Sequence, residues 1–157
     1  MERIVIRKAR AEEHEVISAL ALRSKGHWGY SADFLEACRA ELTYDAEECE
    51  SGRMWVAEFE GADIVGFTLI TGAPPTGELA ALFVDPLAIG TGCGKMLLQH
   101  ALSQATSRGY ARLTLDADPG AEPFYLHFGA TRTGSSPSAS IPGRLLPQLT
   151  FSLPSPS

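Results

Sequence analysis

The chain has 157 residues, enough for a sizeable core, and we expect residues 1–157 to fold as a single domain. Apolar residues make up 45% and charged residues 20%, the balance of a globular protein in water, and no run approaches the roughly 18 apolar residues of a membrane-spanning helix. A net charge of −6 without any block of Lys or Arg argues against nucleic acid as a partner.

The cysteines and the amino terminus bear on where the protein works. Cys38, Cys49 and Cys93 form no CxxC pair and have no nearby histidine, which argues against a disulfide framework and against a zinc site. The N-terminal stretch MERIVIRKAR mixes charges with Ile and Val, so it lacks the continuous apolar region of a signal peptide. We therefore expect a cytoplasmic protein with no metal and no membrane partner.

The first half of the chain predicts a strand, two helices and a pair of strands. In residues 11–24, Val16, Ile17, Leu20 and Ala21 recur at helical spacing and mark one apolar face. Ser31 is a suitable N-cap for the second helix, which carries Phe34, Leu35 and Cys38. The other expected elements are a strand at 2–8, an irregular aromatic segment at 26–30, and strands at 53–59 and 63–71.

Glycine and proline divide the second half into shorter elements. A β-rich run at 78–84 ends before Pro86, and the helix that follows stops at Arg108-Gly109, a typical C-terminal signal. Residues 134–144, rich in Ser, Pro and Gly, predict a loop. The remaining elements are a strand at 112–116, a short helix at 121–128, a last strand in LLPQLTFSL and a frayed end at 153–157. The order β-α-α-β-β-β-α-β-α-β-β indicates a mixed α/β protein with helices on the faces of its sheet.

The stretch DPLAIGTGCGKML, from Asp85 to Leu97, places three glycines at alternate positions before a helix. A P-loop is excluded because Ile89 stands at its first glycine and Met96 at its Ser/Thr position. A dinucleotide fingerprint is excluded because the spacing is G-x-G-x-G in mid-chain. The remaining binding interpretation is a turn whose amides meet the positive end of a helix dipole, which suits a pyrophosphate without a metal. The alternative is a flexible connection between strand and helix.

From Glu78 to Ala130 the chain resembles the GCN5-related N-acetyltransferase (GNAT) superfamily. The resemblance lies in ELAALFVDPLAIGTGCGKMLLQHAL and in EPFYLHFGA. The turn of that family reads Gln/Arg-x-x-Gly-x-Gly/Ala after a strand that ends in V-x-P. Val84-Asp85-Pro86 fits the strand end, and Gly92 and Gly94 fit the two small positions.

Two positions depart from the family pattern. Ile89 stands where Gln or Arg is usual, which removes a polar contribution to the turn that Lys95 offsets in part. Gly120 stands where many relatives have an asparagine near the cofactor. The first half of the chain matches the family in the order of its elements rather than in motifs.

The resemblance implies the GNAT fold, with a mixed central sheet of about seven strands flanked by about four helices. It implies binding of acetyl-CoA as cosubstrate, without a metal. The pantetheine arm is then expected on the main chain of Leu82, Phe83 and Val84, at the end of the strand before the turn. The other residues expected at the cofactor are Ile89, Gly90, Thr91, Gly92, Cys93, Gly94, Lys95 and Tyr125.

Acetyl transfer to an amine needs a base and an acid. A primary amine with a pKa of about 10.4 is neutral at pH 7 in only about one molecule in 2,500, so a general base is useful. Glu78, where relatives often place a carboxylate, is the leading candidate, with Asp116 and Asp118 as weaker ones; its alternative is a solvated strand end. Tyr125 matches the family tyrosine that approaches the CoA sulfur and is the candidate acid; its alternative is a buried structural tyrosine.

The acceptor amine needs its own binding groups. Arg23, His27, Trp28 and Tyr30 lie in the connection that rims the acceptor cleft in this family, although Trp28 and Tyr30 also suit a plug beneath the loop. Arg144, in the loop before the last strand, could clamp a carboxylate. Together these groups suggest an acceptor with an anionic end.

We therefore expect an acetyl-CoA-dependent N-acetyltransferase that acts on a small-molecule amine, such as an amino acid or related metabolite, by direct attack in a ternary complex. The alternatives are a protein N-terminal or lysine acetyltransferase and a non-catalytic CoA-binding module, which the departures at Ile89 and Gly120 leave open. Nothing in the sequence argues against a homodimer.

Overall fold

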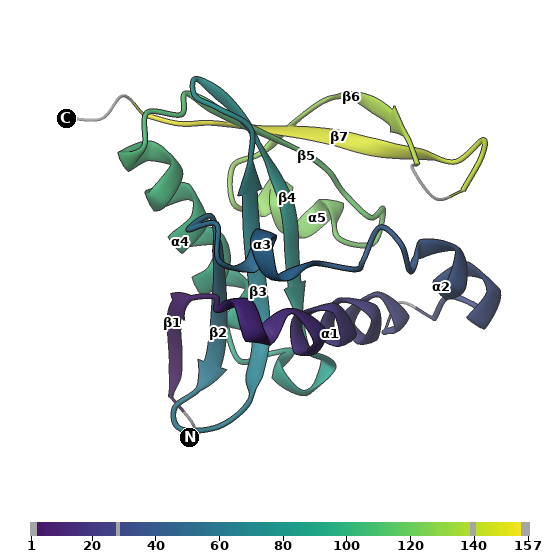
Figure 1. Ribbon diagram of the computed structural model, residues 1–157. Coiled ribbons are helices and arrows are strands. Elements are labelled where there is room, and N and C mark those ends of the chain that lie inside the picture. Colours follow the sequence, from purple (N-terminus) through teal and green to yellow (C-terminus); the bar gives the residue numbers. More distant parts are fainter. Residues whose placement is uncertain (1–2, 28, 139–140, 155–157) are drawn as a thin grey trace. The chain divides into compact units, whose positions relative to one another are not determined.

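The structure is a computed structural model that describes residues 3–27, 29–138 and 141–154 (Figure 1). The strands are β1 (Ile4–Lys8), β2 (Met54–Phe59), β3 (Ile64–Thr71), β4 (Thr76–Val84), β5 (Arg112–Asp116), β6 (Thr131–Pro137) and β7 (Leu145–Ser152). The helices are α1 (His14–Gly26), α2 (Ala32–Cys38), α3 (Ala46–Cys49), α4 (Cys93–Ser107) and α5 (Glu122–His127), with 3-10 turns at Ala11–Glu13 and Pro86–Ala88. None of the helices in these ranges is long and apolar enough to cross a membrane.

The seven strands form one mixed sheet in the order β1-β2-β3-β4-β5-β7-β6, which confirms the predicted fold class. The pairs β1–β2, β2–β3, β5–β7 and β6–β7 are antiparallel. The pair β4–β5 is parallel and short, from Thr76 opposite Arg112 to Glu78 opposite Thr114. Beyond this ladder, Leu115 and Asp116 of β5 pair with β7.

The chain divides into two compact units. One contains Met1–Leu69 and Ala81–Ala101, and the other contains Ile70–Ala80 and Leu102–Ser157. The elements β3, β4 and α4 each contribute residues to both units. The prediction of a single domain is not tested by this division and stays a prediction.

The core of the first unit explains why α1 and the glycine turn are where they are. Ile17 and Leu20 of α1 are fully buried in one apolar cluster with Val56 and Phe67 of the sheet. A second cluster collects residues from β2, β3 and the segment around the glycines: Ala57, Val65, Ala88, Cys93 and Leu97. The turn is therefore anchored on both sides of its glycines by buried side chains.

The core of the second unit surrounds a glycine in β4. Tyr110 is almost fully buried, and a Cβ built on Gly77 would lie 2.5 Å from its ring. The Tyr110 hydroxyl donates a hydrogen bond to the carbonyl oxygen of Gly72. Only glycine leaves room for this ring beside β4.

Two local predictions needed correction. The four-residue helix α3 was not predicted, although Asp45 and Glu48 form a capping box around it. The prediction of a loop over 134–144 was wrong for residues 134–137, which belong to β6 and pair with β7. Main-chain hydrogen bonds of that ladder form regardless of the low β-propensity of Ser and Gly.

Gly66 of β3 generates a prediction, because a Cβ there would lie 2.8 Å from Leu97 Cδ1, 3.0 Å from Cys93 Sγ and 3.1 Å from the Phe83 oxygen. Gly66→Ala should lower the free energy of unfolding by about 1–3 kcal/mol, because the start of α4 must move away from the sheet. Urea denaturation measures this change. Gly26→Ala is the matched control: its Cβ would meet only Leu35, at 3.5 Å, in a helix where alanine is favoured. Equal stability of the two variants would contradict the prediction.

Candidate functional site

The glycine turn has the open backbone that an anion needs. Gly90 and Gly92 adopt φ angles of +84° and +86°, the left-handed region that glycine alone enters without strain. A Cβ at either position would meet nothing within 4 Å, so the space beside the backbone is open. A molecule of the size of a pyrophosphate can approach these two residues closely.

Hydrogen bonds hold this turn at the start of α4. The Ala88 oxygen accepts from the Thr91 amide at 3.2 Å and also from the Thr91 hydroxyl. The same hydroxyl oxygen accepts from the Cys93 amide at 3.4 Å, and the Met96 amide donates to the Gly92 oxygen at 3.0 Å. The first amides of α4 have no acceptor within the helix, and the helix dipole is positive at this end. The turn therefore has the open backbone and the helix N-terminus that were expected of a phosphate-binding segment, and its contact with acetyl-CoA stays a prediction.

The side chains of the turn differ in role. Cys93 is buried in the core, and burial raises the pKa of its thiol to about 11, so the thiol stays protonated and does not act as a nucleophile. Ile89 is 52% exposed and Lys95 is exposed. Leu82, Phe83 and Val84, the predicted pantetheine contacts, are half-buried at the end of β4. Their role stays a prediction.

The predicted acceptor segment begins at Arg23, whose guanidinium binds Asp85: Nε and Nη2 donate to Oδ2 at 3.2 and 2.8 Å. Tyr30 stacks on the ring of Phe34 at 4.2 Å, which agrees with the packing alternative for this side chain. His27 follows α1 and is exposed. Trp28 lies outside the described residues.

A groove of about 800 Å³ runs beside α1 within the first unit. Ser18, Leu22 and Arg23 of α1 line it, together with Leu35 and Leu42 from the following segment. Arg23 therefore has a cavity on one side and Asp85 as its partner.

In the second unit, Glu78 and Asp116 lie on the same face of neighbouring strands. Glu78 is opposite Thr114 in the parallel ladder, so Asp116, two residues further along β5, shares its face. Both carboxylates are exposed, whereas the alternate residues Leu79 and Leu115 are buried. Burial of part of the side chain, and then the Asp116 charge, raise the pKa of Glu78 above its usual range. A raised pKa suits a group that takes a proton from an ammonium ion.

Tyr125 of α5 has a buried ring, 7% exposed, that contacts Phe124 and Phe151 edge-on. Burial raises the pKa of its hydroxyl, which is therefore protonated at neutral pH and able to donate. Within the described part of the chain no hydrogen bond occupies this hydroxyl, and its oxygen is not among the buried unpaired atoms. The hydroxyl therefore reaches the surface while the ring fixes its position.

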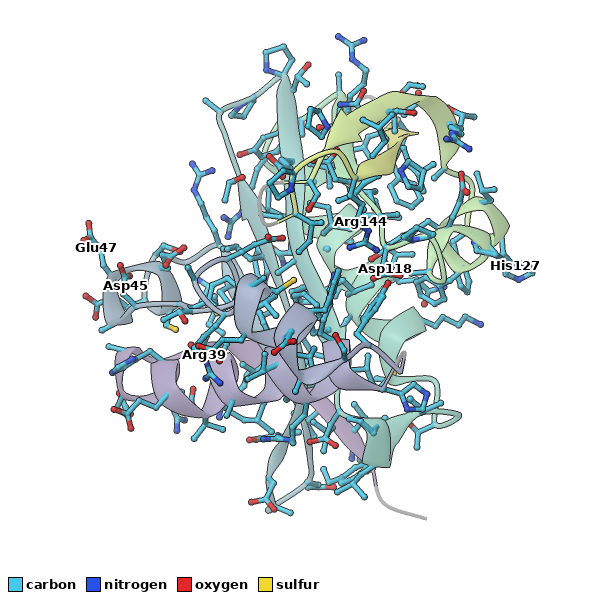
Figure 2. The ribbon with its side chains drawn as sticks, turned by 90° about the vertical axis from the view of Figure 1, so that its right-hand side faces the viewer. Arg39, Asp45, Glu47, Asp118, His127 and Arg144 are labelled. Atoms are coloured by element: carbon cyan, nitrogen blue, oxygen red, sulfur yellow. The ribbon has the colours of Figure 1, made fainter. Side chains whose placement is uncertain are left out.

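Figure 2 shows Asp118 and Arg144 lying beside each other, while His127 points away from them. Arg144 Nη2 is 3.9 Å from Asp118 Oδ2, and both side chains are mostly buried. Asp118 Oδ1 also accepts from the Gly120 amide at 3.1 Å. The predicted carboxylate clamp thus already has a carboxylate of the protein as partner.

No group of three or more His, Cys, Asp or Glu side chains in the described ranges is placed to hold a metal ion. His100, on α4, lies edge-on to Trp55 with ring centroids 5.4 Å apart. His127 is exposed.

Sequence reasoning missed Asp85 as a site residue. Its carboxylate is buried, accepts from the Leu87 amide at 3.0 Å and binds Arg23. The Asp-Pro pair that opens the 3-10 turn was the signal for the capping bond. No signal in the sequence links Asp85 to an arginine 62 residues away.

Comparison with known proteins identifies the family to which the chain belongs. A model described as "Acetyltransferase (GNAT) family" matches residues 17–130. The chain is 37% identical over 135 residues to the peptidyl-lysine N-acetyltransferase YjaB of Salmonella typhimurium, covering 85% of this chain and 87% of that protein. It is 35% identical over 139 residues to the 5-NmdU N-acetyltransferase of Pseudomonas phage PaMx11, covering 85% and 91% of the two.

The comparison with solved structures agrees with the family match. A GCN5-related N-acetyltransferase from Rhodopseudomonas palustris superposes with a TM-score of 0.77 and 26% identity over 98% of both chains. The PaiA N-acetyltransferase from Thermoplasma acidophilum, solved with coenzyme A, has the same fold, with a TM-score of 0.75 and 18% identity over 96% of this chain and 99% of that one. With the family model matching most of its length and two relatives above 30% identity, this chain belongs to the GNAT family of acetyltransferases.

Proposed function

We propose that this acetyltransferase moves the acetyl group of acetyl-CoA to a primary amine, and that the lysine side chain of a peptide is its first acceptor. The observation that carries the proposal is the pair Glu78 and Asp116. Two exposed carboxylates on one face attract an ammonium ion, and the raised pKa of Glu78 suits proton removal. The relative named a peptidyl-lysine N-acetyltransferase, similar over 85% of this chain, supports the choice of lysine.

A small-molecule amine with an anionic end is the second candidate, and it rests on Arg144. The Asp118 carboxylate beside this guanidinium reduces the attraction for a second carboxylate. An amino acid bound there would have to displace or share Asp118. This is why we place the small-molecule acceptor after the peptidyl lysine.

The donor supplies a thioester whose acetyl carbon is open to direct attack by an amine. The chain's own contribution on this side is to bind and orient. The amides around Gly90 and Gly92 and the start of α4 would hold the phosphates, and Lys95 adds a positive charge. The main chain of β4 near its end would hold the pantetheine arm.

The proton transfers are assigned to two side chains. Glu78, directly or through water, takes the proton that the acceptor ammonium must lose before its nitrogen can attack. Tyr125 donates a hydrogen bond or proton to the departing sulfur, because its hydroxyl is protonated and reaches the surface. Asp116 acts on the reaction through the pKa of Glu78.

The acceptor assignment is tested by release of CoA thiol from acetyl-CoA. A peptide with a blocked N-terminus and one lysine should release thiol, and the same peptide with arginine in place of lysine should not. Release with free amino acids alone would contradict the peptidyl-lysine acceptor and favour the second candidate. A rise in melting temperature with acetyl-CoA but no release with any amine would indicate a non-catalytic CoA-binding protein.

The pH dependence of kcat/KM tests Glu78. Glu78 takes its proton from the bound ammonium, so the reactive pair is a charged Glu78 and a protonated amine. A plot of log kcat/KM against pH should therefore be level between the pKa of Glu78 and that of the amine, and should fall with slope 1 below the pKa of Glu78. Asp116→Asn removes one cause of the raised pKa, and the break should therefore move to lower pH. Glu122→Gln removes the same charge from α5 and should leave the break in place. A break that Asp116→Asn does not move would exclude the proposed coupling.

Tyr125→Phe tests the acid. The leaving thiol has a pKa near 8.5 by analogy with cysteine, so losing the donor should lower kcat about 10- to 100-fold. Stability should hardly change, because the hydroxyl has no hydrogen-bond partner among the described residues. Tyr110→Phe is the matched control: it breaks the bond to Gly72, costs about 1 kcal/mol of stability and should spare kcat. Full kcat in the Tyr125 variant, with chemistry rate-limiting, would leave only a packing role.

A further inference from the structure

The ion pair between Arg23 and Asp85 links α1 to the residue that follows β4. Two nitrogens of the guanidinium donate to one carboxylate oxygen, at 3.2 and 2.8 Å. The Asp85 side chain is 9% exposed and that of Arg23 is 51% exposed. A buried carboxylate is costly without a partner, and Arg23 supplies the positive charge.

The other bonds of Asp85 fix the start of the glycine turn. Its second carboxylate oxygen accepts from the Leu87 amide at 3.0 Å. Its amide donates to the Val65 oxygen at 2.7 Å, and its carbonyl oxygen accepts from the Ala88 amide at 2.8 Å. The main chain and one carboxylate oxygen of Asp85 therefore hold the strand end and the 3-10 turn, and the other carboxylate oxygen binds Arg23.

These bonds continue into the phosphate-binding residues. The Ala88 oxygen accepts from the Thr91 amide, and the Thr91 hydroxyl in turn accepts from the Cys93 amide, the first residue of α4. Ala88 is buried, 1% exposed. A change in the orientation of Asp85 would therefore reach Gly90 and Gly92 through two hydrogen-bonded residues.

Charge gives the ion pair a second effect. Burial by itself would raise the pKa of Asp85, but the Leu87 amide and the Arg23 guanidinium outweigh burial and lower the pKa, so the carboxylate is charged at neutral pH. An unpaired negative charge at the base of a turn that binds phosphates would repel them. Arg23 cancels that charge.

We propose that Arg23 is a positioning residue for the donor: by holding and neutralising Asp85 it sets the affinity of the glycine turn for the pyrophosphate of acetyl-CoA. The inference rests on the donor assignment of the proposed function and is independent of the acceptor. It differs from the role that the sequence suggested for Arg23, a contact with the acceptor. The two roles predict changes in different kinetic constants.

The variants are Arg23→Gln and Arg23→Lys, measured with two donors. S-acetylpantetheine lacks the pyrophosphate and the nucleotide. Its kinetics therefore report every step except the binding of those two groups. Arg23→Gln should raise KM for acetyl-CoA about 5- to 30-fold, the range of a charge-assisted hydrogen bond, and leave kcat and the acceptor KM within about twofold. Its kcat/KM for S-acetylpantetheine should be unchanged. Arg23→Lys keeps the charge but not the paired donors and should recover part of the loss.

Two further variants separate the proposal from simple destabilisation. Arg7→Gln breaks another partly buried ion pair of the first unit, with Glu13 and Glu58, and should lower the melting temperature without changing KM for acetyl-CoA. Adding Asp85→Asn to Arg23→Gln removes the unpaired charge and should restore part of the affinity for acetyl-CoA.

Equal losses with both donors, or a loss of acetyl-CoA affinity in Arg7→Gln that follows its melting temperature, would overturn the proposal in favour of a structural role. A rise in the acceptor KM alone would overturn it in favour of acceptor binding. If no acceptor is turned over, calorimetry compares the affinities of the wild-type protein and of Arg23→Gln for CoA and for pantetheine. A lower affinity of the variant for CoA alone supports the proposal. Failure of the wild-type protein to bind CoA would overturn the donor assignment and this inference together.

Discussion

Main-chain amides can bind a pyrophosphate only if the turn that carries them is held by groups other than the ligand. In this protein Asp85, which has a buried carboxylate, holds the turn at the point where it leaves β4. The carboxylate accepts from the Leu87 amide of the 3-10 turn, while the main-chain oxygen of Asp85 accepts from the Ala88 amide and the Ala88 oxygen accepts from the Thr91 amide. The glycines can then remain bare, with positive φ and open space beside them, because the order of the turn does not depend on their side chains.

The second unit uses burial in a different way. Rings and alternate strand residues are buried, and this leaves the polar ends of Tyr125, Glu78 and Asp116 at the surface with fixed directions. The parallel ladder of β4 and β5 places Glu78 opposite Thr114, so that Asp116, two residues further along β5, lies on the same face. Partial burial and the neighbouring Asp116 raise the pKa of Glu78. Burial of the Tyr125 ring against Phe124 and Phe151 fixes the ring and keeps its hydroxyl protonated.

The sequence was informative where a signal is local. Helical spacing, the Ser31 cap and the alternate glycines predicted α1, α2 and the turn, because each depends on residues close together in the chain. Strand β6 was partly missed because its pairing with β7, rather than its composition, makes it a strand. The shared face of Glu78 and Asp116 depends on the register of β4 and β5, in which Thr76 lies opposite Arg112. The ion pair of Arg23 with Asp85 joins residues 62 positions apart in the chain, and neither arrangement leaves a mark in the sequence.

Ile89 makes the ion pair more important in this chain than the family pattern would suggest. Where a relative carries Gln or Arg at this position, a polar or positive side chain stands at the turn itself. Here an apolar side chain, 52% exposed, takes that place, so under the proposed function the phosphates would be bound by the amides, the helix dipole and Lys95. Ile89 carries no positive charge that could offset the negative charge of Asp85, so this charge must be neutralised by a residue outside the turn. Arg23 of α1, 62 residues before Asp85 in the chain, supplies the positive charge that neutralises this carboxylate.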